Sequence, residues 1–430
     1  MLAQFLSLAI YLLLTEVYLH DYLSQEKLTM ETFNIPTEIT EEQIAAHVIA
    51  PEHVQNIEIE EINESKEERY QIQLLNRQFT IPPKLNVDAF GKAMHNSLKD
   101  SVTGYMLQLH QNGNLIYNLI WNWAQTPADK GQGWSEDTRM HIASVSKFLT
   151  AVGLVKVLDS NQIYYDTKII DYLPNYWSKG NNIDKITFRH LLTHTSGFNT
   201  GSSASDYTFM KSKVAAGVTN VGSYNYENMN FGLCRILIPI INGNVSKNAN
   251  FPVSFPISQD QVWDIVTLSY YKNYMQANLF TPAGVSNVDF KPISSTKNAL
   301  AYQFPHNNNK GWDSGDLASV AGGAGWRLST KELLNVMNHV RRRNTIITAQ
   351  KAQYMLDNYF GIDQVINTPV GRIYNKNGLW RSGDKKTEQS VAYFLPNDME
   401  LVVFVNSPIG ASGLSLRDIV KDKFINSLSE

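Results

Sequence analysis

The feature that most constrains the fold is a pair of β-hairpin patterns, one near each end of the apolar part of the chain. Residues 105–117 hold two apolar, β-favouring runs around Asn112-Gly113, a dipeptide typical of a two-residue hairpin turn. Residues 391–405 hold two more such runs, separated by the turn residues 396–398. We therefore expect an antiparallel sheet built from both ends of the chain.

Helical patterns flank the two hairpins and also lie between them. Residues 87–98 form one such pattern, and after the second hairpin apolar residues recur at helical spacing: Leu416, Ile419, Val420, Phe424 and Leu428. Residues 145–158 and 331–341 are helical in a mixed central region whose loops are rich in Asn, Gly and Ser. The predicted fold class is α/β, of the α+β type, with the sheet flanked by helices and a helical subdomain inserted.

Composition narrows the range of partners. The chain has 430 residues, 43% hydrophobic, with a net charge of -3 and no sustained Lys/Arg run, which excludes a disordered chain and disfavours a nucleic-acid binder. The single cysteine, Cys234, allows no intrachain disulfide, and no Cys/His cluster has the spacing of a structural zinc site. We expect no metal, no cofactor and no nucleic acid, and a small molecule or peptide as the partner.

The N-terminal segment has two interpretations. Residues 5–14 are almost all apolar, as in the core of an export signal, yet no Lys or Arg precedes them and no Ala-x-Ala site follows. Glu16 and His20 interrupt any longer apolar run, so a buried or interfacial helix fits equally well. The segment is compatible with membrane association. It also favours an extracytoplasmic location, periplasmic or secreted.

A polar, acidic stretch follows. Residues 51–70 hold seven Glu against Lys66 and Arg69, with too few hydrophobic residues to define a core. We interpret residues 1–80 as the apolar segment plus an acidic extension, and residues 81–430 as the compact domain. A solvated face of short elements packed on that domain is the alternative.

Catalytic signatures point to one serine. Gly-x-Ser-x-Gly, His-Glu-x-x-His and the Gly-x-x-x-x-Gly-Lys phosphate loop are absent from the sequence. Ser-x-x-Lys occurs five times, with its serines at positions 24, 144, 269, 294 and 382. Ser144 differs from the others because an apolar stripe follows it, formed by Val145, Phe148, Leu149, Val152 and Val155, which places it at the start of a core helix.

That position suits a nucleophile. Ser144 and Lys147 would share one helix face, so the amine could accept the hydroxyl proton, and burial would lower the pKa of Lys147. The free N–H groups at the helix start would favour a developing oxyanion. From the helix alone, a capping serine and a solvated lysine remain the alternative.

Further motifs lie downstream in a fixed order. Tyr226 and Asn228 form a Tyr-x-Asn motif 82 residues after Ser144, and Lys376-Asn377-Gly378 follows 150 residues after Tyr226. Tyr-x-Asn also occurs at Tyr271, whereas Lys-x-Gly occurs only once.

With these motifs, the chain resembles the serine β-lactamase and penicillin-binding-protein superfamily, most closely the branch of class C β-lactamases, D-amino-acid peptidases and related esterases. Residues 141–147 are similar to the family's nucleophile segment, residues 191–198 to its hallmark loop, and residues 321–333 to the stretch before its late helix. The resemblance extends from about residue 84 to residue 427 and implies a β-lactamase/transpeptidase-like fold.

The resemblance also implies a role for each motif. Ser144 would be the acylated nucleophile, Lys147 its proton acceptor or its electrostatic partner, and Tyr226 would share the role of base. Asn228 would contact Lys147 or the substrate amide. Lys376, Asn377 and Gly378 would line the substrate, and the oxyanion would lie between the backbone N–H groups of Ser144 and Leu379.

The third motif departs from the family pattern, because many relatives have Thr where this chain has Asn377. Asn377 and Lys376 could still bind a substrate carboxylate. The bulky residues 379–381 predict a narrower cleft, which favours cleavage of a peptide of D-amino-acid type, an amide or an ester over efficient β-lactam hydrolysis. Two alternatives stay open: a slow-turnover penicillin-binding or sensor protein or β-lactamase of the same fold, and a catalytically inactive interaction protein.

Overall fold

A computed structural model describes residues 83–251, 257–410 and 415–429. The apolar segment at residues 5–14 and the acidic extension lie outside the described residues, so the predicted boundary at residue 80 stays a prediction. Within the described ranges, no helix combines the length and hydrophobicity that a membrane span requires.

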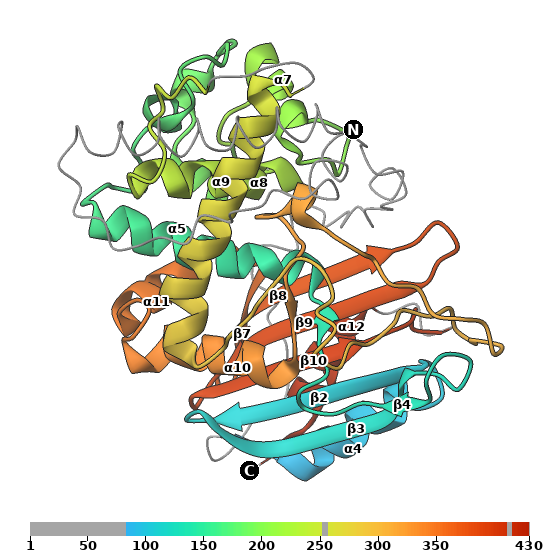
Figure 1. The fold of residues 1–430 in the computed structure, drawn as a ribbon. Helices are drawn as coiled ribbons and strands as arrows, with labels where there is room; N and C mark the ends of the chain where they lie inside the picture. Colours follow the sequence, from blue (N-terminus) through green and yellow to red (C-terminus); the bar gives the residue numbers. More distant parts are fainter. Residues whose placement is uncertain (1–82, 252–256, 411–414, 430) are drawn as a thin grey trace.

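The centre of the molecule is a seven-stranded antiparallel sheet with the order β4-β3-β2-β10-β9-β8-β7 (Figure 1). Its strands are β2 (Gly104–Gln111), β3 (Asn114–Gln125), β4 (Gln132–Gly133), β7 (Gln364–Thr368), β8 (Gly371–Arg381), β9 (Thr387–Leu395) and β10 (Met399–Val405). Strand β2 pairs with β10, so the two predicted hairpins meet at the middle of the sheet. The sheet built from both chain ends is therefore confirmed.

Both hairpin turns use backbone conformations that their sequences favour. Asn112 and Gly113 join β2 to β3 with φ values of 53° and 79°, and Asn397 and Asp398 join β9 to β10 with φ values of 56° and 57°. Positive φ at both central residues matches the right-handed twist of the paired strands, and Asn, Asp and Gly adopt it most readily.

Two short sheets accompany the central one. Strand β1 (Lys84–Leu85) pairs with β11 (Leu428–Ser429), and β5 (Met140–His141) pairs with β6 (Arg327–Leu328).

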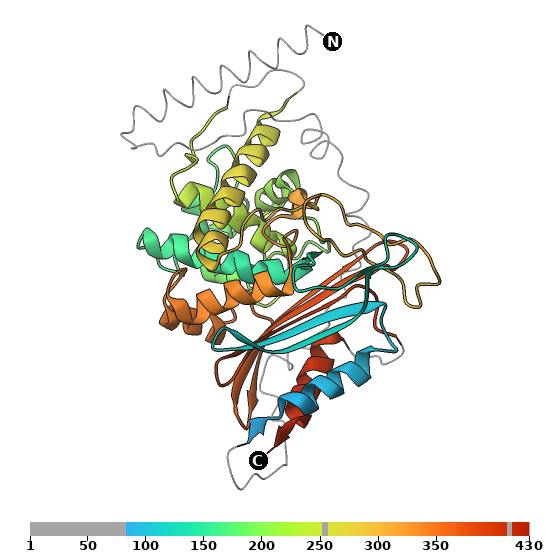
Figure 2. The ribbon, with the colours of Figure 1, turned by 60° about the horizontal axis from the view of Figure 1, so that its bottom comes forward.

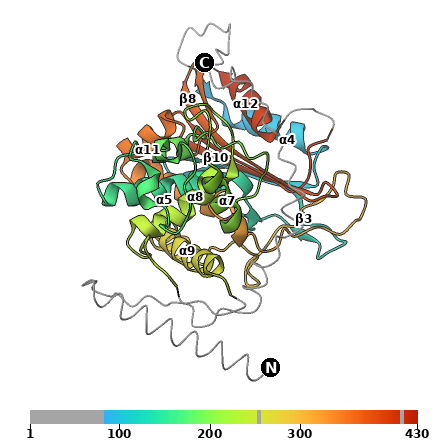
Figure 3. The same cartoon turned by 90° about the horizontal axis from the view of Figure 1, so that it is seen from above.

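Helices cover both faces of the sheet. They are α4 (Val87–Leu98), α5 (Ser146–Ser160), α6 (Phe188–Leu192), α7 (Tyr207–Ala216), α8 (Asn228–Ile241), α9 (Gln259–Met275), α10 (Thr330–Asn338), α11 (Ala349–Asp357) and α12 (Leu416–Asn426). Helices α4 and α12 lie side by side on one face, and α5 and α10 cover the other (Figure 2). Helices α7, α8 and α9 gather beyond α5 (Figure 3). They form the predicted helical subdomain.

Each face of the sheet buries its own apolar core. On β2, Met106 faces the core under α5, whereas Tyr105 and Leu107 face the core under α4 and α12. This alternation is the two-residue period of a strand whose two faces are both covered. The sheet is thus a shared wall between a small helical layer and the larger subdomain.

Helix α5 is buried more completely than its sequence indicates. The predicted apolar stripe describes one face, but the polar side chains of Ser146, Lys147 and Thr150 are buried as well. The sheet packs on one side of α5, while α8 and α9 pack on another. Polar residues on this helix therefore need internal hydrogen-bond partners.

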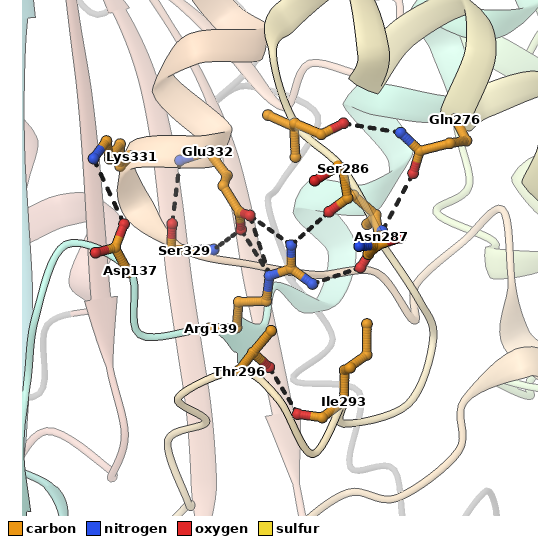
Figure 4. A network of polar contacts seen from close by, with 12 residues as sticks. Asp137, Arg139, Gln276, Ser286, Asn287, Ile293, Thr296, Ser329, Lys331 and Glu332 are labelled. Atoms are coloured by element: carbon orange, nitrogen blue, oxygen red, sulfur yellow. Dashed lines mark hydrogen bonds and ion pairs between the residues drawn. The ribbon is translucent and has the colours of Figure 1, made fainter.

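The segment that leads to β5 and α5 is anchored by Arg139 (Figure 4). Its guanidinium donates to Glu332 on α10 at 2.9 and 2.5 Å. It also donates to the backbone oxygens of Asn287 at 2.7 Å and Ser286 at 2.9 Å. Arg139 thus joins three separate parts of the chain just before the Ser144 segment.

Replacing Arg139 with Met should lower the free energy of unfolding by about 3 kcal/mol, because it leaves a largely buried carboxylate unpaired. The control is Lys331→Met, whose ion pair with Glu136 joins side chains 45% and 42% exposed. That exposed pair is expected to contribute at most about 1 kcal/mol. Denaturant titration of both variants measures the difference, and equal shifts in midpoint would contradict the anchoring role.

Candidate active site

Ser144 lies in a single 3-10 turn, Ala143–Val145, that leads directly into α5. Ala143 has a φ of 46°, an uncommon conformation for a residue with a Cβ. The hydroxyl of Ser390 on β9 donates to the Ile142 carbonyl at 2.7 Å. The turn that carries Ser144 is therefore fixed against the sheet at the start of a core helix, as the sequence predicts.

Lys147 is the nearest basic group to Ser144. Its Nζ lies 2.9 Å from Ser144 Oγ, 2.6 Å from Asn228 Oδ1 and 2.8 Å from the Gly323 carbonyl. Burial, together with the nearby charge of Lys376, holds the pKa of Lys147 well below its usual value, although Asp363 opposes the shift.

The hydrogen-bond partners of Lys147 define where its lone pair points. A neutral amine has two N–H groups and one lone pair, and the two carbonyl oxygens of Asn228 and Gly323 can only accept. When Lys147 is in its neutral form, these two oxygens occupy both of its N–H groups. The lone pair is then left for the hydroxyl proton of Ser144, which is the arrangement that a general base needs.

Tyr226 approaches Ser144 from the other side. Its hydroxyl donates to Ser144 Oγ at 2.9 Å. The Nζ atoms of Lys147 and Lys376 lie 4.9 and 5.0 Å from the centre of the Tyr226 ring. Ser144 thus lies between two groups that could accept its proton, Lys147 as a neutral amine and Tyr226 once it is a phenolate, and both belong to motifs identified in the sequence.

The loop that carries Tyr226 is held by His194, whose ring stacks on the Tyr226 ring with centroids 4.3 Å apart. His194 Nδ1 accepts from the Glu227 backbone N–H at 3.1 Å, and the side chain of Asn230 lies 3.2 Å away. The Glu227 carboxylate in turn accepts from the backbone and the hydroxyl of Thr200, both at 2.7 Å. His194 therefore positions Tyr226.

The other histidine of this region serves a different purpose. His190 Nδ1 accepts from the Thr187 backbone N–H at 3.1 Å and completes the N-terminal cap of α6. In the described part of the chain, no three His, Cys, Asp or Glu side chains are grouped as a metal site.

The Lys376-Asn377-Gly378 motif lies on β8, beside the serine turn. The Lys376 ammonium forms an ion pair with Asp363, and the other carboxylate oxygen of Asp363 accepts from the Asn377 backbone N–H at 2.9 Å. Lys376 is 1% exposed and Asp363 5%. A buried ion pair with Asp363 therefore fixes the lysine of the third motif in the site.

Gly378 allows β8 to approach the serine turn closely. A Cβ at Gly378 would lie 2.4 Å from Ser390 Oγ and 2.5 Å from the Ile142 carbonyl oxygen, so no larger residue fits without displacement.

The direction of the Leu379 N–H follows from strand alternation. The Asn375 carbonyl and the Asn377 N–H both face the edge towards Asp363. Since backbone groups two residues apart point the same way, the Leu379 N–H faces that edge too, beyond the end of β7.

A second buried acid–base pair lies beneath the serine turn. His141 Nε2 accepts from the Gly325 backbone N–H at 3.1 Å, and its Nδ1 lies 3.0 Å from a Glu388 carboxylate oxygen. Burial lowers the pKa of His141, although Glu388 opposes the shift. The pair is consistent with a neutral imidazole that ties β5 to β9.

All eight predicted site residues come together: Ser144, Lys147, Tyr226, Asn228, Lys376, Asn377, Gly378 and Leu379. The second Tyr-x-Asn motif does not join them, because the buried Tyr271 hydroxyl instead lies 2.8 Å from Thr150 Oγ1. Sequence reasoning missed Asp363 and the Gly323 carbonyl as partners. Asp363 directly precedes β7, but no local pattern marks it as the partner of a lysine 13 positions later.

Comparisons with known proteins agree with this architecture. The beta-lactamase family model matches residues 90–419. FmtA from Staphylococcus aureus is similar in structure, with 15% sequence identity, 82% of this chain and 93% of that chain covered, and a TM-score of 0.58. A class C β-lactamase from Rhodobacter sphaeroides has 14% identity, coverage of 79% and 99%, and a TM-score of 0.58.

A D-amino acid amidase from Ochrobactrum anthropi SV3, solved with L-phenylalanine, has 15% identity, coverage of 79% and 98%, and the same TM-score of 0.58. At such identities the structural matches establish the fold alone. The family model, however, matches most of the sequence directly. The chain therefore belongs to the beta-lactamase family, within the serine β-lactamase and penicillin-binding-protein superfamily.

Proposed function

We propose that this protein is a cofactor-independent serine hydrolase that forms an acyl-enzyme on Ser144. The observation that carries the proposal is the position of Ser144 Oγ, 2.9 Å both from Lys147 Nζ and from the Tyr226 hydroxyl. A serine hydroxyl becomes an effective nucleophile when an adjacent base can take its proton.

In the acylation step, Ser144 Oγ attacks the substrate carbonyl carbon while Lys147 Nζ accepts the hydroxyl proton. The new Oγ–C bond forms a tetrahedral intermediate, whose oxyanion accepts hydrogen bonds from the Ser144 and Leu379 backbone N–H groups. The bond to the leaving group then breaks, and the leaving alcohol or amine takes a proton from Lys147 or Tyr226.

In the deacylation step, a water molecule attacks the acyl carbon and gives a proton to whichever of Tyr226 and Lys147 protonated the leaving group. The bond to Ser144 Oγ then breaks, and the serine takes that proton back from the same side chain, which restores the starting state. Tyr226 suits this role because the Lys376 ammonium, and Lys147 once it is protonated, lie close to its ring and would stabilise negative charge on the phenol.

The proposed substrates are esters, amides and peptides of D-amino-acid type. The bulk of Leu379, Trp380 and Arg381 after Gly378 disfavours efficient β-lactam turnover. A slow-turnover penicillin-binding protein would share the acylation step and differ only in the lifetime of the adduct.

Intact-protein mass spectrometry over time tests the proposal, with a penicillin and an activated ester added separately to the wild type and to Ser144→Ala. We expect the ester to add the acyl mass to the wild type alone, and the adduct to decay as product appears. A persistent adduct would indicate the slow-turnover protein. No adduct and no product with either reagent, or equal labelling of Ser144→Ala, would overturn the proposed function.

A further inference from the structure

The charge of Lys376 is already matched inside the protein. Its ammonium contacts one oxygen of the Asp363 carboxylate, and the Asn377 backbone N–H donates to the other oxygen at 2.9 Å. The Asp363 N–H donates to the Asn375 carbonyl at 2.8 Å. Three successive residues of β8 are thus bound to this one aspartate.

The pair is closed to solvent. Side-chain exposure is 2% for Lys376 and 5% for Asp363. Burial alone would raise the pKa of Asp363, but the charges of Lys376 and Arg417 and the two hydrogen bonds lower it below its usual value. The carboxylate is therefore ionised. Arg417 belongs to α12, a helix on the face of the sheet opposite α5 (Figure 2).

A buried carboxylate beside Lys376 weakens any attraction for an anionic substrate. Coulomb energy falls with the inverse of distance, so a carboxylate about 4 Å from the ammonium and about 7 Å from Asp363 would lose more than half of that attraction. Lys376 and Asp363 are both buried, so a substrate carboxylate that reached the ammonium would leave water and lie beside a second negative charge, which is unfavourable.

We propose that Asp363 is a specificity-determining residue, which reserves Lys376 for Tyr226 and selects substrates whose leaving group carries no carboxylate. This inference rests on the proposed acyl-enzyme function. The substrate class is then uncharged esters and amides, including peptides with a blocked C-terminus. Free C-terminal peptides and penicillins, which present a carboxylate on the leaving side, would be poor substrates.

The same pair positions the site. Lys376 and Lys147 flank the Tyr226 ring at about equal distances, 5.0 and 4.9 Å. Asp363 holds the Lys376 ammonium in place. Its negative charge also reduces the repulsion that Lys376 exerts on a proton at Lys147. Asp363 acts through Lys376 and need not touch the substrate, so it is a positioning residue.

Two matched esters test the proposal on the wild-type protein: 4-acetoxybenzoate, whose leaving group is anionic, and 4-acetoxybenzamide, its neutral counterpart. After correction for the rates in buffer, we expect kcat/KM for the neutral ester to be about tenfold higher, because the attraction that remains is smaller than the cost of removing a carboxylate from water. A preference for the anionic ester would overturn the inference while leaving the acyl-enzyme function intact. If neither ester acylates Ser144, the proposed function fails, and the inference with it.

The variant Asp363→Asn keeps the shape and removes the charge. We expect the ratio of the two kcat/KM values to shift by about tenfold towards the anionic ester. Loss of the negative charge also lowers the pKa of Lys147 further, so the acidic limb of the kcat/KM profile should move to lower pH. A purely structural role would move neither quantity.

The control is Asp357→Asn. Asp357 forms an ion pair with Arg372, and Arg372 lies on β8 four residues before Lys376. The ratio of the two kcat/KM values in this variant should equal that of the wild type. An unchanged ratio and an unchanged pH profile in a folded Asp363→Asn protein would overturn the inference. If this variant does not fold, the ester comparison on the wild type still decides the question.

Discussion

Replacing Lys147 with Met should slow the acylation of Ser144 by about 10³-fold, because the serine loses the base that faces it. Methionine has nearly the same length and no lone pair of comparable basicity. In the wild type, kcat/KM should fall as the pH falls through the lowered pKa of Lys147, because protonation occupies the lone pair that accepts the Ser144 proton. That acidic limb should vanish in the variant. Acylation rates from stopped-flow release of an activated ester's leaving group, measured across pH, check both expectations.

The control for this substitution is Lys156→Met on the same helix. Lys156 Nζ donates to the Ile346 carbonyl at 2.8 Å and takes no part in the site. Its acylation rate should stay within about twofold of the wild type. If Lys147→Met acylates nearly as fast as the wild type while remaining folded, Tyr226 is the base in this step and the assignment to Lys147 is wrong.

Replacing Gly378 with Ala should reduce acylation by about 10² to 10³-fold. The new methyl group would lie 2.4 Å from Ser390 Oγ and 2.5 Å from the Ile142 carbonyl oxygen. The Ile142 oxygen belongs to the backbone and cannot rotate away, so β8 must move away from the serine turn. The Leu379 N–H moves with it and no longer reaches the oxyanion. Because the oxyanion forms after substrate binding, kcat should fall much more than KM rises.

Gly133→Ala on β4 provides the matched comparison. There the nearest atom to an added Cβ is the Asn122 carbonyl oxygen at 3.7 Å, an ordinary contact distance. We expect unchanged kinetics. Crystal structures or thermal melts of both variants would show whether the Gly378 effect is confined to the site, and equal kinetics in the two would contradict the oxyanion assignment.

Local patterns in the sequence were sufficient for the two hairpins and the four helices predicted near them, but not for strands β4, β7 and β8 or for helices α6 to α9 and α11. The helix predicted at residues 87–98 is α4, and the hairpin turns at residues 112–113 and 397–398 have the expected positive φ values. These features depend on neighbouring residues only. The complete burial of α5 was not predictable in this way, because it results from the sheet on one side and α8 and α9 on another.

The same distinction between local and tertiary features applies to the site. Its eight residues could be identified because they belong to ordered motifs that resemble a family. Their partners could not, because Asp363 and the Gly323 carbonyl reach the site through tertiary packing. The sequence left open whether Lys376 binds a carboxylate of the substrate. The structure instead places a carboxylate of the protein beside it.

The pairing of β2 with β10 has a consequence for biosynthesis. Tyr105 pairs with Val405, so 300 residues separate the two partners along the chain. At about 5 to 20 residues per second, the ribosome reaches β10 about 15 to 60 seconds after it has made β2. Until then, the inner edge of β2 stays open to pairing with other chains. Nascent copies should therefore depend on chaperones, and lower temperatures and slower expression should raise the soluble yield.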